Sequence, residues 1–137
     1  MATAGYSGTS LTKKLGFKEG FVVRIVNAPE NYFDLVTDLP EIKIQKSKRA
    51  PKDLIHYFTK SALELSKDIA FLRKEIKPNG MIWVSWPKKT SKVKTDVTED
   101  VIRDLAIWNG LVDVKVCAVD NVWSGLKLVI PVKKRKK

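Results

Sequence analysis

Apolar residues fill some stretches of this chain without interruption and recur every three or four positions in others. The uninterrupted stretches are rich in β-branched and aromatic residues, which is typical of strands that are covered on both faces. We predict such central strands at residues 21–27, 53–59 and 81–87, and a short, polar edge strand at residues 42–45. Central strands of this kind require helices on both sides of the sheet.

Two longer helices are predicted where apolar residues recur at helical spacing behind a capping box. Ser61 with Glu64 begins the first of these helices, which ends at a turn over residues 78–80. Asp96 with Glu99 begins the second. In all, helices are predicted at residues 10–15, 30–36, 61–76 and 97–109.

The end of the chain changes character, because only Asp120-Asn121 separates two apolar runs, at residues 111–119 and 122–130. So short a connection permits only an antiparallel hairpin. The full pattern predicts a three-layer α/β domain with a mostly parallel sheet in the order 2-1-3-4-6-5, counted along the chain, and a C-terminal antiparallel hairpin. The direction of the strand at residues 42–45 stays open, because the connection after it has no room for a crossover helix.

With 137 residues, the chain is long enough for one domain and one core. We predict an N-terminal arm with a short helix at residues 1–20, a single α/β domain at residues 21–130 and a basic tail at residues 131–137. The lone Cys117 cannot form an internal disulfide and is expected to be buried in a strand. No apolar run has the length of a signal peptide or a membrane span, so we expect a cytoplasmic protein without a membrane partner.

The formal net charge of +11 is concentrated in three segments, at residues 43–52, 88–94 and 133–137. These segments hold more than half of the 26 lysines and arginines and no acidic residue. Such loops can contact nucleic-acid phosphates, although runs of like charge are most often solvated surface. Because no recognition helix, zinc-finger spacing or RNA-binding signature is evident, we expect weak and nonspecific nucleic-acid contact at most.

Ligands of open α/β sheets bind beyond the carboxyl ends of the parallel strands. This rule selects nine candidate ligand residues: Asn27, Pro29, Glu30, Thr59, Lys60, Ser61, Trp86, Lys88 and Lys89. Lys88 and Lys89 are candidate phosphate partners, Trp86 is a candidate stacking face, and the helix that begins at Ser61 offers backbone donors to an anion. Trp86 is also the tryptophan expected to reach solvent. In the alternative interpretation, Ser61 only caps its helix and Trp86 only packs.

No catalytic constellation is predicted. His56 is the single histidine and lies in the middle of a strand, which favours a packed side chain over a general base. One cysteine and one histidine cannot supply a metal site. The paired acids Glu99 and Asp100 lie in the first turn of a helix, where the helix dipole explains them. We therefore predict no catalytic residue, metal or cofactor.

The order of strands and helices resembles the class I methyltransferase fold, a Rossmann-like fold whose sheet also ends in an antiparallel hairpin. The turn at residues 77–80 is similar to that superfamily's turn before its fifth strand. The resemblance implies a cofactor site at the strand ends, but residues 27–31 lack its glycine loop. The strand that ends near Gln45 also lacks an acidic residue to hold a ribose.

Five sequence blocks in order are similar to a family of small bacterial proteins catalogued as domain of unknown function 3052. The resemblance covers about residues 5–129. Its blocks are residues 5–9, 27–30, 83–89, 95–100, and 114–120 together with 123–127. The resemblance implies no particular activity.

Taken together, the sequence favours a non-enzymatic α/β binding module that holds an anionic ligand or a protein partner at the strand carboxyl ends. One alternative is an enzyme or sensor that binds a nucleotide-type ligand in the same crevice. The other is accessory nucleic-acid contact through the basic loops and the tail. The identity of the ligand and the oligomeric state stay open.

Overall fold

A computed structural model describes residues 9–49 and 51–135 of the chain. Its six strands are β1 (Val22–Val26), β2 (Lys43–Ile44), β3 (Lys52–Phe58), β4 (Ile76–Pro87), β5 (Val112–Ala118) and β6 (Trp123–Val129). They form one sheet in the order β2-β1-β3-β4-β6-β5, which confirms the predicted order. Residues 1–8 of the predicted arm and residues 136–137 of the predicted tail lie outside the described residues.

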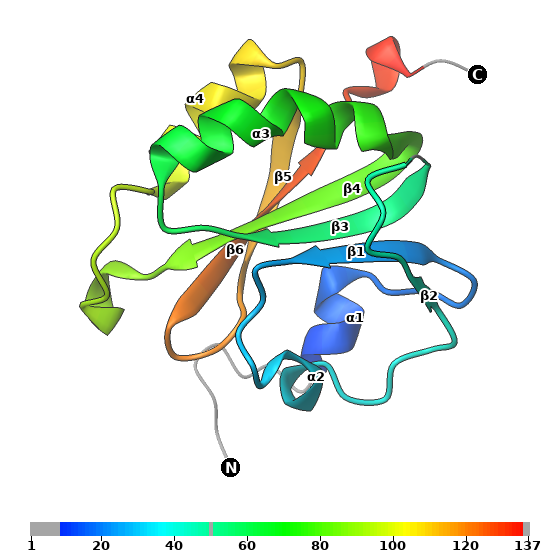
Figure 1. Ribbon diagram of the computed structural model, residues 1–137, viewed down its shortest axis with the longest axis horizontal. Coiled ribbons are helices and arrows are strands. Elements are labelled where there is room, and N and C mark those ends of the chain that lie inside the picture. Colours follow the sequence, from blue (N-terminus) through cyan, green and yellow to red (C-terminus); the bar gives the residue numbers. More distant parts are fainter. Residues whose placement is uncertain (1–8, 50, 136–137) are drawn as a thin grey trace.

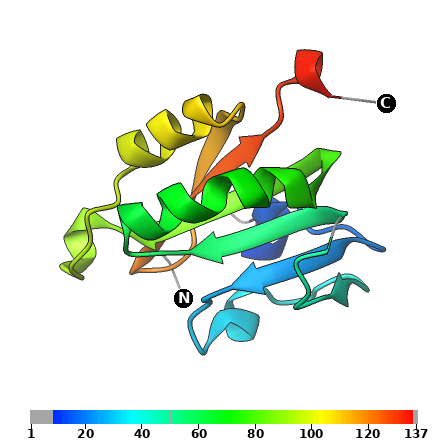
Figure 2. The ribbon, with the colours of Figure 1, turned by 45° about the horizontal axis from the view of Figure 1, so that its top comes forward.

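Helices cover both faces of the sheet. They are α1 (Leu11–Leu15), α2 (Tyr32–Leu35), α3 (Ala62–Glu75) and α4 (Glu99–Trp108), with the 3-10 turns η1 (Lys89–Ser91) and η2 (Val132–Lys134). Figure 1 and Figure 2 show α3 and α4 on one face of the sheet and the short helices α1 and α2 on the other. This arrangement confirms the predicted three layers.

The sheet is parallel from β2 through β1 and β3 to β4, and antiparallel from β4 through β6 to β5. The question left open by the sequence is settled, because β2 runs parallel to β1 with Val22 opposite Lys43. In the part of the connection from β2 to β3 that the structure describes, residues 45–49 and 51, there is no helix. At the other edge, the register of β5 against β6 shifts between Asp113 and Lys115, which marks a β-bulge.

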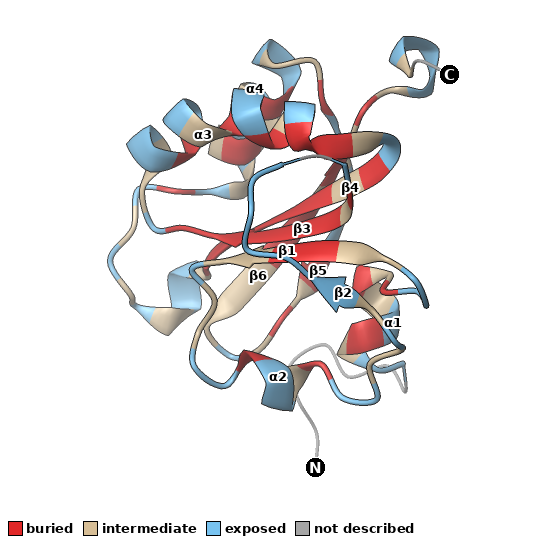
Figure 3. Ribbon diagram, turned by 45° about the vertical axis from the view of Figure 1, so that its right-hand side comes forward, coloured by how far each residue is buried: buried red, intermediate tan, exposed pale blue. Residues whose placement is uncertain are grey.

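Two apolar cores lie on the two faces of the sheet. The core beneath α3 and α4 includes Ile55, Leu65 and Leu128. The core beneath α1 and α2 includes Trp83, whose indole N–H donates to the Leu15 carbonyl oxygen at 2.7 Å. Figure 3 shows the buried residues concentrated in β3 and β4, as expected of strands covered on both faces.

The short first helix is capped at both ends: the Ser10 hydroxyl accepts from the Lys13 N–H, and Gly16 ends the helix with φ of 90°. The cap of α4 was predicted wrongly. Thr98, not Asp96, caps this helix and accepts from the Val101 N–H. Asp96 instead accepts a hydrogen bond of 2.8 Å from the Ala62 N–H in the first turn of α3.

The predicted turn at residues 78–80 is also wrong, because α3 passes directly into β4 at Ile76. Lys52 pairs with Ile76, and Leu54 pairs with Met81. Residues 77–80 of β4 therefore face only one residue of β3, which makes the pairing of the two strands irregular here. Gly80 is required here, since a Cβ atom would lie 2.9 Å from the Lys52 carbonyl oxygen. A close approach of two strands, and not a reversal of the chain, explains this glycine.

Candidate functional site

A cleft of about 490 Å³ lies at the carboxyl ends of β1 and β3, where the sequence predicts a ligand site. The predicted residues that line it are Asn27, Pro29, Thr59, Lys60 and Ser61. Three further residues, Phe58, Glu64 and Trp123, complete the wall. The cleft therefore joins the loop after β1, the start of α3 and the start of β6.

The other predicted residues, Glu30, Trp86, Lys88 and Lys89, do not line this cleft. Trp86 is buried, with 8% of its surface exposed, so the expectation that it reaches solvent is wrong. The most exposed tryptophan is Trp108, at 86%, in the last turn of α4. Lys88 and Lys89 follow β4 into η1.

Asn27 shapes the loop that follows β1. Its φ of 57° is in the left-handed region, which glycine and asparagine adopt more readily than other residues. Its side-chain amide donates to the Phe58 carbonyl oxygen at 3.3 Å and so ties the loop to the end of β3. The conformational role that a glycine would have in a cofactor loop is filled here by asparagine.

The start of α3 supplies the charge on the cleft wall. The Ser61 hydroxyl accepts from the Glu64 N–H at 3.1 Å, and the Thr59 hydroxyl donates to Glu64 Oε1 at 2.6 Å. Within the described chain, Glu64 Oε2 and the Lys60 ammonium have no hydrogen bond or ion pair. One carboxylate oxygen and one ammonium group are thus available to a ligand.

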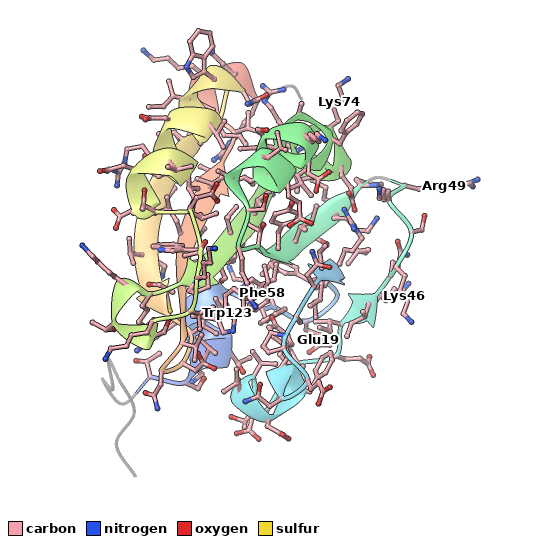
Figure 4. All side chains as sticks on the ribbon, turned by 60° about the vertical axis from the view of Figure 1, so that its left-hand side comes forward. Glu19, Lys46, Arg49, Phe58, Lys74 and Trp123 are labelled. Atoms are coloured by element: carbon pink, nitrogen blue, oxygen red, sulfur yellow. The ribbon has the colours of Figure 1, made fainter. Side chains whose placement is uncertain are left out.

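Aromatic rings form another part of the wall. The Phe58 and Trp123 ring centroids are 5.0 Å apart at 85°, and Figure 4 shows the two side chains next to each other. Phe58 is buried and stacks on His56 at 4.3 Å, whereas Trp123 is only half-buried. Trp123 therefore offers apolar surface to a ligand, while Phe58 holds it in place.

His56 lies beneath this wall and is fully buried, as predicted for a packed histidine. Its Nδ1 is 2.8 Å from the Tyr32 hydroxyl and its Nε2 is 2.7 Å from Ser85 Oγ. Burial lowers the pKa of His56 to about 3 and raises the pKa of the Tyr32 hydroxyl. A neutral, doubly hydrogen-bonded imidazole without access to the cleft is a structural group.

Cys117 is buried, as predicted, and burial raises the pKa of its thiol.

Within residues 9–49 and 51–135, no group of three or more His, Cys, Asp or Glu side chains is arranged to hold a metal ion. In the same part of the chain, none of the helices combines the length and the apolar character needed to cross a bilayer.

Comparison with solved structures identifies the fold. A putative type 11 methyltransferase from Sulfolobus solfataricus matches with a TM-score of 0.65 and 10% identity, covering 93% of both chains. The fold is that of the class I methyltransferases. A SAM-dependent methyltransferase from Aquifex aeolicus matches at 0.60 and 18% identity, over 86% of both chains. Magnesium protoporphyrin IX methyltransferase from Synechocystis PCC 6803 with bound SAH matches at 0.56 and 10% identity, over 87% of this chain and 77% of that chain.

No family model and no curated protein matches the chain. The structural neighbours named above are all methyltransferases, which contradicts the prediction of a non-enzymatic binding module. They favour the alternative interpretation, an enzyme or sensor that binds a nucleotide-type ligand in the crevice at the strand ends.

Proposed function

We propose that this protein is a methyltransferase-type enzyme that binds S-adenosylmethionine in the cleft at the carboxyl ends of β1 and β3. The observation that carries the proposal is the coincidence of this fold with a cleft whose wall combines an aromatic face, a carboxylate and an ammonium group. The cleft lies where ligands bind in open α/β sheets. When bound, this cofactor supplies an activated methyl group.

The residues of the cleft are chemically complementary to the parts of such a ligand. The exposed part of Trp123 provides a face for the adenine ring, as aromatic side chains do for planar ligands. Glu64 Oε2 can accept hydrogen bonds from the ribose hydroxyls. Lys60 can pair with the carboxylate of the methionine moiety. The cleft volume of about 490 Å³ is within the usual range of small-molecule sites.

The proposal places the anchoring charge on α3, because the two usual anchors are absent. The loop after β1 has Asn27 where a glycine loop is expected, and β2 has only two residues, both exposed and without an acid. In this proposal, Glu64 binds the ribose hydroxyls in place of an acidic residue after β2. Its position is fixed by Thr59, so the carboxylate is held in place before a ligand enters.

Calorimetric titration with S-adenosylmethionine and S-adenosylhomocysteine tests the proposal. Glu64→Gln keeps an acceptor for the Thr59 hydroxyl but removes the charge, so we expect about tenfold weaker binding, or about 1.4 kcal/mol. Lys60→Ala should weaken binding by a similar factor. Lys67→Ala, an exposed change on α3 away from the cleft, is the matched control and should have no effect. Failure of both ligands to bind the unaltered protein at millimolar concentration refutes the proposal.

Two finer predictions belong with this proposal. The five sequence blocks support membership of the family catalogued as domain of unknown function 3052, which would make this small family methyltransferase-like in fold.

Nucleic-acid contact through the basic loops would show itself by a steep loss of affinity with rising salt concentration. The affinity of a ligand bound in the cleft should change little with salt concentration.

A further inference from the structure

A second cavity, of about 510 Å³, lies between α3 and β1 on the face of the sheet that α3 covers. The described residues between β2 and β3 form no helix that would cover this part of the sheet. The exposed segment at residues 45–49 passes there instead, and Lys48 from this segment lines the cavity together with Val26 of β1. Figure 3 shows this pale blue segment crossing in front of β1. The cavity shares no lining residue with the cleft at the strand ends.

A buried cluster of three charged residues forms one end of the cavity. Arg24 donates to both carboxylate oxygens of Glu75, from Nε at 2.7 Å and from Nη2 at 2.8 Å. Lys52 Nζ lies 3.4 Å from Glu75 Oε2 and also donates to the Arg49 carbonyl oxygen. Two cations share one carboxylate, so the cluster has a net charge of +1, and none of its three side chains is more than 11% exposed.

One donor of this cluster is free to meet a ligand. Within the described chain, Arg24 Nη1 has no hydrogen-bond partner. All fully buried side-chain nitrogen and oxygen atoms there do have a partner, so Arg24 Nη1 is not fully buried. This nitrogen is therefore accessible from the cavity that Arg24 lines. An anion placed against it would be attracted by the uncompensated charge of the cluster, through a medium that screens little.

The remaining charges around the cavity are mainly positive. Lys48 makes no ion pair within the described chain, and Lys74 Nζ lies 6.0 Å from the centre of the Phe71 ring. The acidic side chain of Asp68 accepts a hydrogen bond of 2.6 Å from the Tyr57 hydroxyl. The cavity lining thus includes two lysines, Lys48 and Lys74, that form no ion pair with a described carboxylate. Figure 4 shows Lys74 at the end of α3.

Between these charged groups, part of the cavity wall is apolar and is formed by Val26, Phe71 and Leu72. Leu72 is buried and Val26 is half-buried, whereas Phe71 has 68% of its surface exposed beside the cavity. A ligand with an apolar part would bury the exposed surface of the Phe71 ring, and this burial would favour binding. The same ligand would need a negative group at the Arg24 end.

We propose that this cavity binds an amphipathic anion, in which an apolar chain carries one carboxylate. The chain packs against Phe71 and Leu72, and the carboxylate accepts hydrogen bonds from Arg24 Nη1 and from the Lys48 ammonium group. Charge complementarity selects this ligand class: the carboxylate balances the net charge of the buried cluster. The volume of about 510 Å³ is sufficient for a small ligand.

Calorimetric titration with decanoate, below its micelle concentration, tests this site. Decanoate should bind at least tenfold more tightly than decanol, which has the same chain without the charge. Lys48→Ala should weaken decanoate binding three- to tenfold, whereas Lys46→Ala, on the same exposed segment but outside the cavity, should leave it unchanged. Equal affinity for decanoate and decanol, or no effect of Lys48→Ala, overturns the proposal.

A second pair of variants tests the apolar wall. Phe71→Ala should weaken decanoate binding at least threefold, and Leu63→Ala, an equally exposed apolar change on α3 away from the cavity, should not. Both side chains are exposed, so both variants should fold. Lys60→Ala, which removes the ammonium group of the cleft, should leave decanoate binding unchanged if the two sites are separate, and a loss as large as that of Lys48→Ala would place decanoate in the cleft and refute the proposal.

Discussion

The buried His56 should make this protein sensitive to acid in a defined pH range. Burial lowers its pKa to about 3 in the folded protein, whereas an exposed histidine has a pKa of about 6.5. Below pH 6.5 the unfolded chain therefore takes up a proton that the folded protein refuses. The contribution of His56 to stability is complete above pH 6.5 and is lost as the pH falls toward 3.

The size of the effect follows from the difference between the two pKa values. Each pH unit below 6.5 removes about 1.4 kcal/mol from the free energy of unfolding. At pH 4.5 the loss is about 2.7 kcal/mol, a large part of the 5–15 kcal/mol that stabilises a typical domain. Protonation would also leave one of the two ring nitrogens without an acceptor unless Tyr32 or Ser85 turned its hydroxyl.

Urea unfolding followed by tryptophan fluorescence between pH 7.5 and 4.5 would measure this loss, with His56→Gln as the reference. The glutamine variant will be less stable throughout, but its free energy of unfolding should fall by about 2.7 kcal/mol less over this range. Because the chain has one histidine, the Hε1 proton of its ring gives a single NMR signal that can be followed in the unaltered protein. A titration of that signal near pH 6.5 in the folded state would refute the reasoning.

Three further changes test the packing and the caps. Glu75→Gln should destabilise the protein by about 3–5 kcal/mol in urea unfolding, because Arg24 and Lys52 lose the carboxylate between them; a loss below 1 kcal/mol would contradict a buried cluster. Gly80→Ala should cost about 1–3 kcal/mol, since its Cβ would lie 2.9 Å from a backbone oxygen, and an unchanged urea midpoint would show that the strands can separate. Ser61→Ala should cost about 1 kcal/mol through loss of the cap on α3, and threonine at this position should restore it.

The strand order could be predicted because the signals for it are local. Unbroken apolar runs mark the central strands, and the two-residue connection at Asp120-Asn121 fixes the closing hairpin as antiparallel. The cap of α4 could not be chosen in the same way. Asp96 and Thr98 both have capping side chains, and the choice depends on Ala62, which is 34 residues from Asp96 in sequence and takes its carboxylate as a partner.

The sequence predicts only those residues of the candidate site that lie directly after a strand. Asn27 and Thr59 follow their own strands, so the rule for open sheets finds them. Trp123 reaches the cleft through the antiparallel register that places it opposite Pro87, and no local pattern encodes that register. The sequence indicates Glu64 only as part of a capping box. The structure adds that the Thr59 hydroxyl binds one carboxylate oxygen of Glu64 and leaves the other for a ligand.

The bulge in β5 bears on how this protein behaves when it is concentrated. The outer edge of the sheet carries Val112, Val114 and Val116, all exposed, and a regular edge strand with such residues would invite strands of other molecules to pair with it. The shift between Asp113 and Lys115 interrupts the regular repeat of β5 near its start. An added strand could not stay in register along the whole of β5, and irregularities of this kind are one way in which edge strands disfavour pairing with other molecules.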